Sequence, residues 1–99
     1  MKFLNIPKKS LGQNFLIDKN IINKIIKIGN ISKNKIVMEL GAGYGNLTQG
    51  IISMKPKTIY AIEKDKKLSL FLKKKFENIN NIKIINRDFL DQTGYFFLV

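Results

Sequence analysis

Three acidic residues, Glu39, Glu63 and Asp88, each follow a short apolar segment with the pattern of a buried strand. A loop with glycine at positions 41, 43 and 45 comes directly after the first of these strands. In an open α/β sheet, ligands bind at the edge formed by the carboxyl ends of the strands. Any one of the acids alone would fit a helix N-cap or a surface charge. Their recurrence, one in each strand–helix unit, favours a shared ligand site along that edge.

The spacing of the glycines and the first acid narrow the choice of ligand. A dinucleotide-binding fingerprint needs its third glycine one residue later, where this chain has Asn46, and there is no P-loop lysine followed by Ser or Thr. Glu39 would repel a pyrophosphate but attract a sulfonium and an ammonium group. S-adenosylmethionine carries both and has no phosphate. Glu63 stands 18 residues after Gly45, roughly the spacing at which an acid at the end of the second strand binds ribose hydroxyls. Asp88, at the end of the third strand, is then placed to accept from the adenine amino group.

The elements that must hold these residues follow from the hydropathy pattern. Apolar segments at 35–40, 58–62 and 82–85 predict three parallel strands, and 95–99 predicts a fourth. Amphipathic patterns predict a first helix that starts at Asp18 or Asn20 and ends near Gly29. Two further helices are predicted at 47–54 and 65–76, the latter with Leu68, Phe71, Leu72 and Phe76 on one buried stripe. The alternation indicates a Rossmann-like α/β fold, truncated after about four parallel strands.

Composition sets further limits. The chain has 99 residues, no cysteine and no histidine, which excludes disulfides, thiolate metal sites and histidine-based catalysis. No apolar stretch approaches the ~18 residues of a membrane span, and a cytoplasmic location is expected. The formal net charge is +11. This charge indicates a nucleic-acid or anionic-membrane partner, or else the lysine bias of an A/T-rich coding sequence. The lysines of the first helix are either solvated or turned towards RNA.

Four motifs together resemble one known family, the ribosomal small-subunit RNA adenine dimethyltransferases, over about residues 8 to 91. The segment at 9–16 reads KSLGQNFL and is similar to that family's N-terminal motif, which generic methyltransferases lack. The segment at 39–48, ELGAGYGNLT, resembles its S-adenosylmethionine loop. AIEKD at 61–65 and RDFL at 87–90 resemble its ribose-binding and adenine-binding acids.

The resemblance implies a Rossmann-like S-adenosylmethionine-dependent methyltransferase that dimethylates adenines in small-subunit ribosomal RNA. It implies a monomer with ribosomal RNA as partner and with neither metal nor membrane. Residues 1–99 would be the incomplete N-terminal part of the cofactor-binding domain, and residues 1–16 a basic N-terminal arm. The cofactor contacts carried over from the family are Asn14, Leu16, Gly41, Glu63 and Asp88, with Gln13, Glu39, Gly43 and Gly45 in support.

The sequence departs from the family at its catalytic motif, Asn-Leu/Ile-Pro-Tyr/Phe, which follows the fourth strand. The segment Asn5-Ile6-Pro7-Lys8 imitates it but lacks the aromatic residue and precedes the first strand. No catalytic residue is therefore assigned, and we expect a truncated reading frame or a fragment that binds cofactor without turnover. Three alternatives remain: a large-subunit rRNA methyltransferase of the antibiotic-resistance type, a non-catalytic basic RNA-binding module, and a nicotinamide-dependent oxidoreductase fragment, which the glycine spacing disfavours.

Overall fold

The computed structural model describes residues 2–4, 19–88 and 96–98. The predicted contacts Gln13, Asn14 and Leu16 lie outside the described residues, so they stay predictions. Each element that the hydropathy pattern predicted is present within a residue or so of its expected bounds. In chain order they are α1 (Lys19–Gly29), β2 (Ile36–Leu40), α2 (Asn46–Ser53), β3 (Thr58–Glu63), α3 (Lys66–Lys75), β4 (Ile82–Asn86) and β5 (Phe96–Leu98). One further short strand, β1 (Lys2–Leu4), was not predicted.

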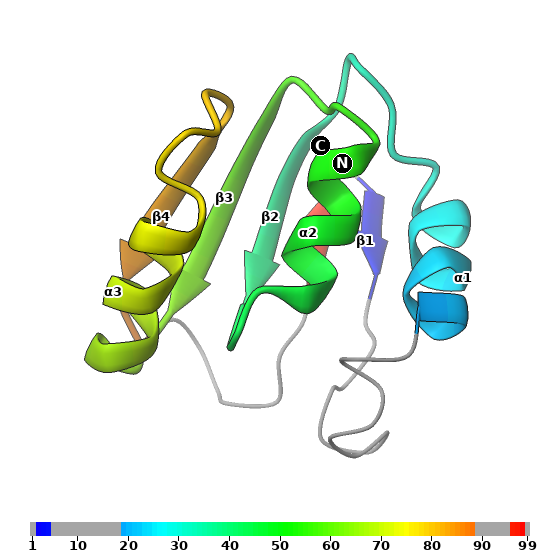
Figure 1. The fold of residues 1–99 in the computed structure, drawn as a ribbon. Coiled ribbons are helices and arrows are strands. Elements are labelled where there is room, and N and C mark those ends of the chain that lie inside the picture. The colour runs from blue at the N-terminus through cyan, green and yellow to red at the C-terminus, as the bar shows by residue number, and fades with distance from the viewer. Residues whose placement is uncertain (1, 5–18, 89–95, 99) are drawn as a thin grey trace.

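The sheet has the strand order β1-β5-β2-β3-β4. Strands β2, β3 and β4 are parallel, with Val37 opposite Ile59 and Ile59 opposite Ile82. Helices α2 and α3 connect them and lie on one face of the sheet (Figure 1). All three strands therefore end at the same edge, as the Rossmann-like fold requires.

The two faces of this sheet differ in burial. On the face covered by α2 and α3, Val37, Ile59 and Ala61 are fully buried. Ala61 belongs to a core cluster with Ala42 from the glycine loop and with Leu72 and Phe76 from the end of α3. On the other face, Met38 and Tyr60 are half-buried, whereas Leu40 and Ile62, nearer the carboxyl edge, are buried. Much of the described core therefore lies between the sheet and its two connecting helices, and Leu40 and Ile62 extend it to the other face near the carboxyl edge.

The direction of the last strand corrects one prediction. The sequence predicted a fourth parallel strand, but β5 runs antiparallel to β2, with Met38 opposite Phe97. Two strands in parallel need a crossover of about a dozen residues or more, usually a helix. The connection from Asn86 to Phe96 is shorter than that and enters β5 from the carboxyl edge of the sheet. The short β1 then pairs antiparallel with β5.

Helix α3 begins where the sequence predicted, but the side chains that it buries differ from the predicted stripe. Asp65 is its N-cap, and its side chain accepts from the N–H of Leu68 at 3.0 Å. Leu72 and Phe76 are buried as expected, but Phe71 is 46% exposed, so its predicted place in the buried stripe is wrong. Ser69 is buried instead, because the face towards the sheet follows the i, i+3, i+7 positions through 69, 72 and 76.

Within residues 2–4, 19–88 and 96–98, none of the helices has the length and apolar character needed to span a lipid bilayer.

Candidate functional site

The glycine loop between β2 and α2 has a backbone conformation that favours glycine. Gly41, Gly43 and Gly45 all have positive φ angles, of 75°, 60° and 85°. The loop is tied to the end of β3, because the N–H groups of Gly41 and Ala42 both donate to the carbonyl of Ile62, at 2.7 and 3.3 Å. The loop therefore lies at the carboxyl edge where the sequence placed it.

Two of these glycines serve different purposes. A Cβ atom on Gly45 would lie 2.9 Å from both Leu72 and Phe76, so this glycine lets the loop pack against α3. A Cβ atom on Gly43 would meet nothing within 4 Å. The space beside Gly43 is therefore open, as a loop that admits a ligand against its backbone requires.

Glu63 joins the glycine loop to the start of α3. Its Oε1 accepts from the N–H of Gly43 at 2.8 Å, and its Oε2 accepts from the N–H of Asp65 at 2.9 Å. The side chain is only 6% exposed. The structure thus brings together Glu63 and Gly43, two predicted site residues that lie far apart in the sequence.

Asn86, at the end of β4, is a residue of this site that the sequence reasoning missed. Its Nδ2 donates to the carbonyls of Glu63 and Lys64, at 2.9 and 3.1 Å, and the N–H of Arg87 donates to the Glu63 carbonyl at 3.2 Å. The carboxyl ends of β3 and β4 are therefore linked at Glu63. An amide side chain next to the predicted Arg-Asp motif was the one available signal in the sequence.

Glu39 and Asp88 are placed differently from Glu63. Glu39 is fully buried and accepts a hydrogen bond from the hydroxyl of Thr48, itself fully buried on α2. Its charge therefore lies behind the loop, joined to the helix that the loop enters. Asp88 is exposed, two residues beyond the end of β4 and at the same edge of the sheet as Glu63.

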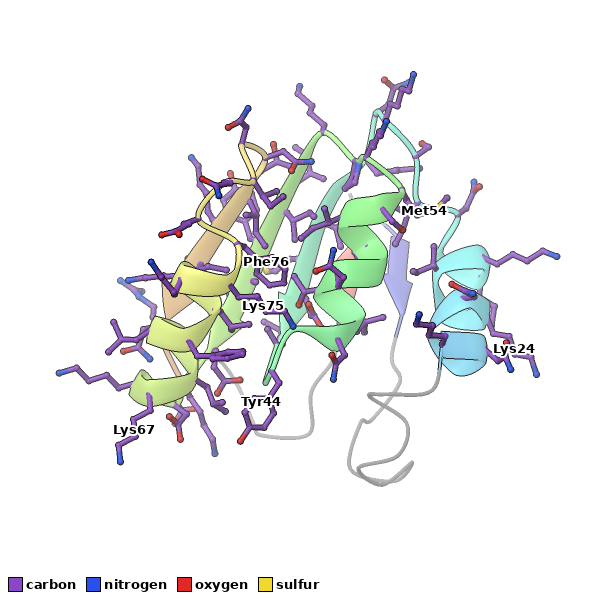
Figure 2. All side chains as sticks on the ribbon, in the orientation of Figure 1. Lys24, Tyr44, Met54, Lys67, Lys75 and Phe76 are labelled. Carbon is purple, nitrogen blue, oxygen red and sulfur yellow. The ribbon has the colours of Figure 1, made fainter. Side chains whose placement is uncertain are left out.

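An exposed aromatic pair lies beside the glycine loop and was also missed. The rings of Tyr44 and Phe71 meet edge to face, with centroids 5.7 Å apart and planes at 79°. Lys75 donates to the carbonyl of Tyr44 at 2.8 Å. Figure 2 shows Tyr44 projecting from the loop and Lys75 on the neighbouring helix α3. Nothing in the local pattern around Tyr44 signals this contact, which joins residues distant in the sequence.

Known proteins share both the sequence and this fold. The Ribosomal RNA adenine dimethylase family matches residues 5–98. A ribosomal RNA small subunit methyltransferase A from Pelagibacter ubique is 54% identical over 83 residues, which cover 84% of this chain and 30% of that protein. The chain thus spans about a third of the length of such relatives.

Two solved structures superpose on the chain. A dimethyladenosine transferase from Plasmodium falciparum is 30% identical with a TM-score of 0.67, covering 76% of this chain and 28% of that one. The 23S rRNA methyltransferase ErmE is 28% identical with a TM-score of 0.68, covering 76% and 30%. The family match extends over nearly all of the sequence and includes the glycine loop, Glu63 and Asp88. The chain belongs to the ribosomal RNA adenine dimethylase family.

Proposed function

We propose that this chain is the cofactor-binding part of a methyltransferase that uses S-adenosylmethionine to dimethylate adenines in small-subunit ribosomal RNA. The observation that carries the proposal is the Glu63 carboxylate, which is bonded to Gly43 beside an open space. Each carboxylate oxygen has two acceptor positions, so Glu63 can hold its two backbone donors and still accept from ribose hydroxyls.

The other residues of the edge fit the remaining parts of the cofactor. Asp88 is exposed at the end of the neighbouring strand, so its carboxylate can accept from the adenine amino group. Gly43 leaves the loop backbone open to the methionine part. Glu39 lies buried behind the loop, where a carboxylate favours a cationic ligand over a pyrophosphate. When bound, the cofactor supplies an electrophilic methyl group, and the residues of this chain hold and orient it.

Glu63→Gln tests the proposal, with Glu77→Gln as a matched control. Glu77 is exposed and forms a surface ion pair with Lys74 at 3.3 Å, so its substitution makes the same charge change away from the site. A hydrogen bond to a charged group contributes about 1.5–3 kcal/mol. We therefore expect Glu63→Gln to weaken S-adenosylmethionine binding at least tenfold by isothermal titration calorimetry, with Glu77→Gln unchanged. Equal affinity of both variants and the parent chain would refute the cofactor role of Glu63.

One observation favours a second function, that of a basic RNA-binding module without catalysis. The chain has a net charge of +11, and lysines of α1 and α3 such as Lys24, Lys67 and Lys73 are exposed. A module of this kind would bind RNA and show no saturable heat with S-adenosylmethionine. The same calorimetric titration therefore separates the two functions.

A further inference from the structure

The rings of Tyr44 and Phe71 are unusual for their exposure. Tyr44 is 61% exposed and Phe71 is 46% exposed, although both belong to segments that pack against the core. Large apolar side chains left together at a surface often mark an interaction site. Tyr44 belongs to the glycine loop and Phe71 to the neighbouring helix α3, at the edge of the sheet where the candidate site is.

The rings are also held in place. Lys75 donates to the Tyr44 carbonyl at 2.8 Å, while its Nζ lies 5.8 Å from the centroid of Phe71 and 5.4 Å from that of Phe76. The lysine therefore fixes the backbone of Tyr44 and lies over the Phe71 ring. A ring that is already ordered loses less conformational freedom when a partner binds to it.

The charge around this pair is positive. The last turn of α3 carries Lys73, Lys74 and Lys75, of which Lys74 pairs with Glu77, and the acid at the start of the helix is its N-cap, Asp65. A partner that suits this surface has a flat aromatic face for Tyr44 and negative charge for the lysines. Unpaired nucleotides of RNA have both, since bases stack on aromatic side chains while phosphates contact lysines.

We propose that Tyr44, supported by Phe71 and Lys75, forms a stacking surface for an unpaired RNA base beside the cofactor loop. The proposal rests on the proposed function for the identity of RNA as partner. It assigns to the chain an RNA contact that is separate from Glu63 and Asp88 and that uses stacking in addition to charge. A base held there would lie next to the loop that positions the methyl donor.

The test uses the 99-residue chain, a short unstructured oligoribonucleotide with a fluorophore, and an abasic oligomer of the same length. Binding is followed by fluorescence anisotropy at several salt concentrations and without S-adenosylmethionine. Stacking contributes enough per base that we expect Tyr44→Ala to weaken binding to the normal oligomer about fivefold or more. Tyr44→Phe should bind like the parent chain, because it keeps the ring. Circular dichroism checks that each variant is folded.

Two comparisons separate stacking from charge. Tyr44→Ala should leave the slope of log affinity against log salt unchanged, because no phosphate contact is lost. On the abasic oligomer the parent chain and Tyr44→Ala should bind equally. Ile28→Ala removes an apolar side chain that is 59% exposed on α1 and should have no effect on either oligomer.

The proposal is wrong if Tyr44→Ala binds the normal oligomer as tightly as the parent, or if its loss is just as large on abasic RNA. A loss in Ile28→Ala equal to that in Tyr44→Ala would also overturn it. Because these titrations contain no cofactor, they are independent of the Glu63→Gln experiment. The stacking surface and the cofactor site can therefore fail separately.

Discussion

Glu63 uses one side chain to hold two backbone segments, and its own backbone is held in turn by Asn86. The carboxylate accepts from Gly43 and Asp65, while the Asn86 amide donates to the carbonyls of Glu63 and Lys64. These bonds connect the ends of three strands around a side chain that is 6% exposed. At the scale of the residue, the orientation of Glu63 is thus set by its neighbours before any ligand arrives.

Asn86→Asp tests this arrangement at nearly constant shape. The substitution removes both N–H donors and sets a carboxylate against two carbonyl oxygens. Because Asn86 is exposed to water, we expect the free energy of unfolding to fall by about 0.5–1.5 kcal/mol. Affinity for S-adenosylmethionine should fall as well, because the backbone of Glu63 loses its support. Urea denaturation and calorimetric titration measure the two effects.

The control is Asn78→Asp, which makes the same charge change in the exposed turn after α3. Exposed substitutions usually change stability by less than about 0.5 kcal/mol. If both aspartate variants unfold at the same urea concentration as the parent chain, the Asn86 hydrogen bonds contribute nothing to stability.

The positions of Glu63 and the glycines at the carboxyl edge were predictable from sequence because their signal is local, while their role in cofactor binding stays a prediction. An acid at the end of an apolar strand and glycines at alternate positions can be read within a few residues. Asn86, Tyr44 and Phe71 could not be found in that way. Their contacts join segments that are far apart in the chain, and one sequence carries no record of which distant residues meet. Asn14 and Leu16 stay predictions, outside the described residues.

At the scale of elements, the packing of α3 against the glycine loop fixes where the loop lies. Gly45 sits against Leu72 and Phe76, so loop and helix approach closely. The helix pattern predicted the bounds of α3 but placed Phe71 in its buried stripe, because periodicity defines a face only to within a residue or two. The direction of β5 was missed for a related reason. A strand pattern carries no direction, and the sequence prediction did not weigh that the connection before β5 is shorter than a parallel crossover needs.

Gly45→Ala and Gly43→Ala form a matched pair for this element. Both put a Cβ on a residue with positive φ, at a cost of about 1–2 kcal/mol. Only the Cβ at Gly45 also collides with Leu72 and Phe76, which adds about 1–3 kcal/mol. We expect Gly45→Ala to have the lower melting temperature. Gly43→Ala, whose methyl group enters the open space, should lose more affinity for the cofactor than its small loss of stability explains. Equal melting temperatures would show that α3 yields to the added methyl group.

At the scale of the whole molecule, the sheet buries its two faces unequally. Val37 and Ile59 are fully buried beneath α2 and α3, whereas on the opposite face Met38 and Tyr60 are half-buried and burial is reached at the carboxyl end, at Leu40 and Ile62. Sheets of parallel strands are usually covered on both faces. The overall class and the order of the elements from α1 to β5 were predictable from the hydropathy pattern, but this inequality was not, because the central strands are apolar at nearly every position.

Lysine substitutions at adjacent positions of β2 test the inequality. Val37→Lys places a charge in the closed face, at a cost of several kcal/mol that a small domain cannot absorb. Met38→Lys can extend its ammonium to water from the half-exposed face. We expect circular dichroism to show Met38→Lys folded and Val37→Lys unfolded. A folded Val37→Lys variant would mean that both faces of the sheet accept a lysine side chain.

The acceptor positions left on Glu63 bear on how a ligand would enter. Each carboxylate oxygen accepts one backbone N–H and keeps a second position. Two vicinal hydroxyls can therefore be received without displacing the loop or unwinding the first turn of α3. Hydrogen bonds from the ligand hydroxyls would add to those from the Gly43 and Asp65 N–H groups and would not replace them. Calorimetry of adenosine binding should accordingly show little of the entropic penalty that accompanies ordering of a loop. Hydrogen exchange at the Gly43 and Asp65 amides should already be slow in the free protein.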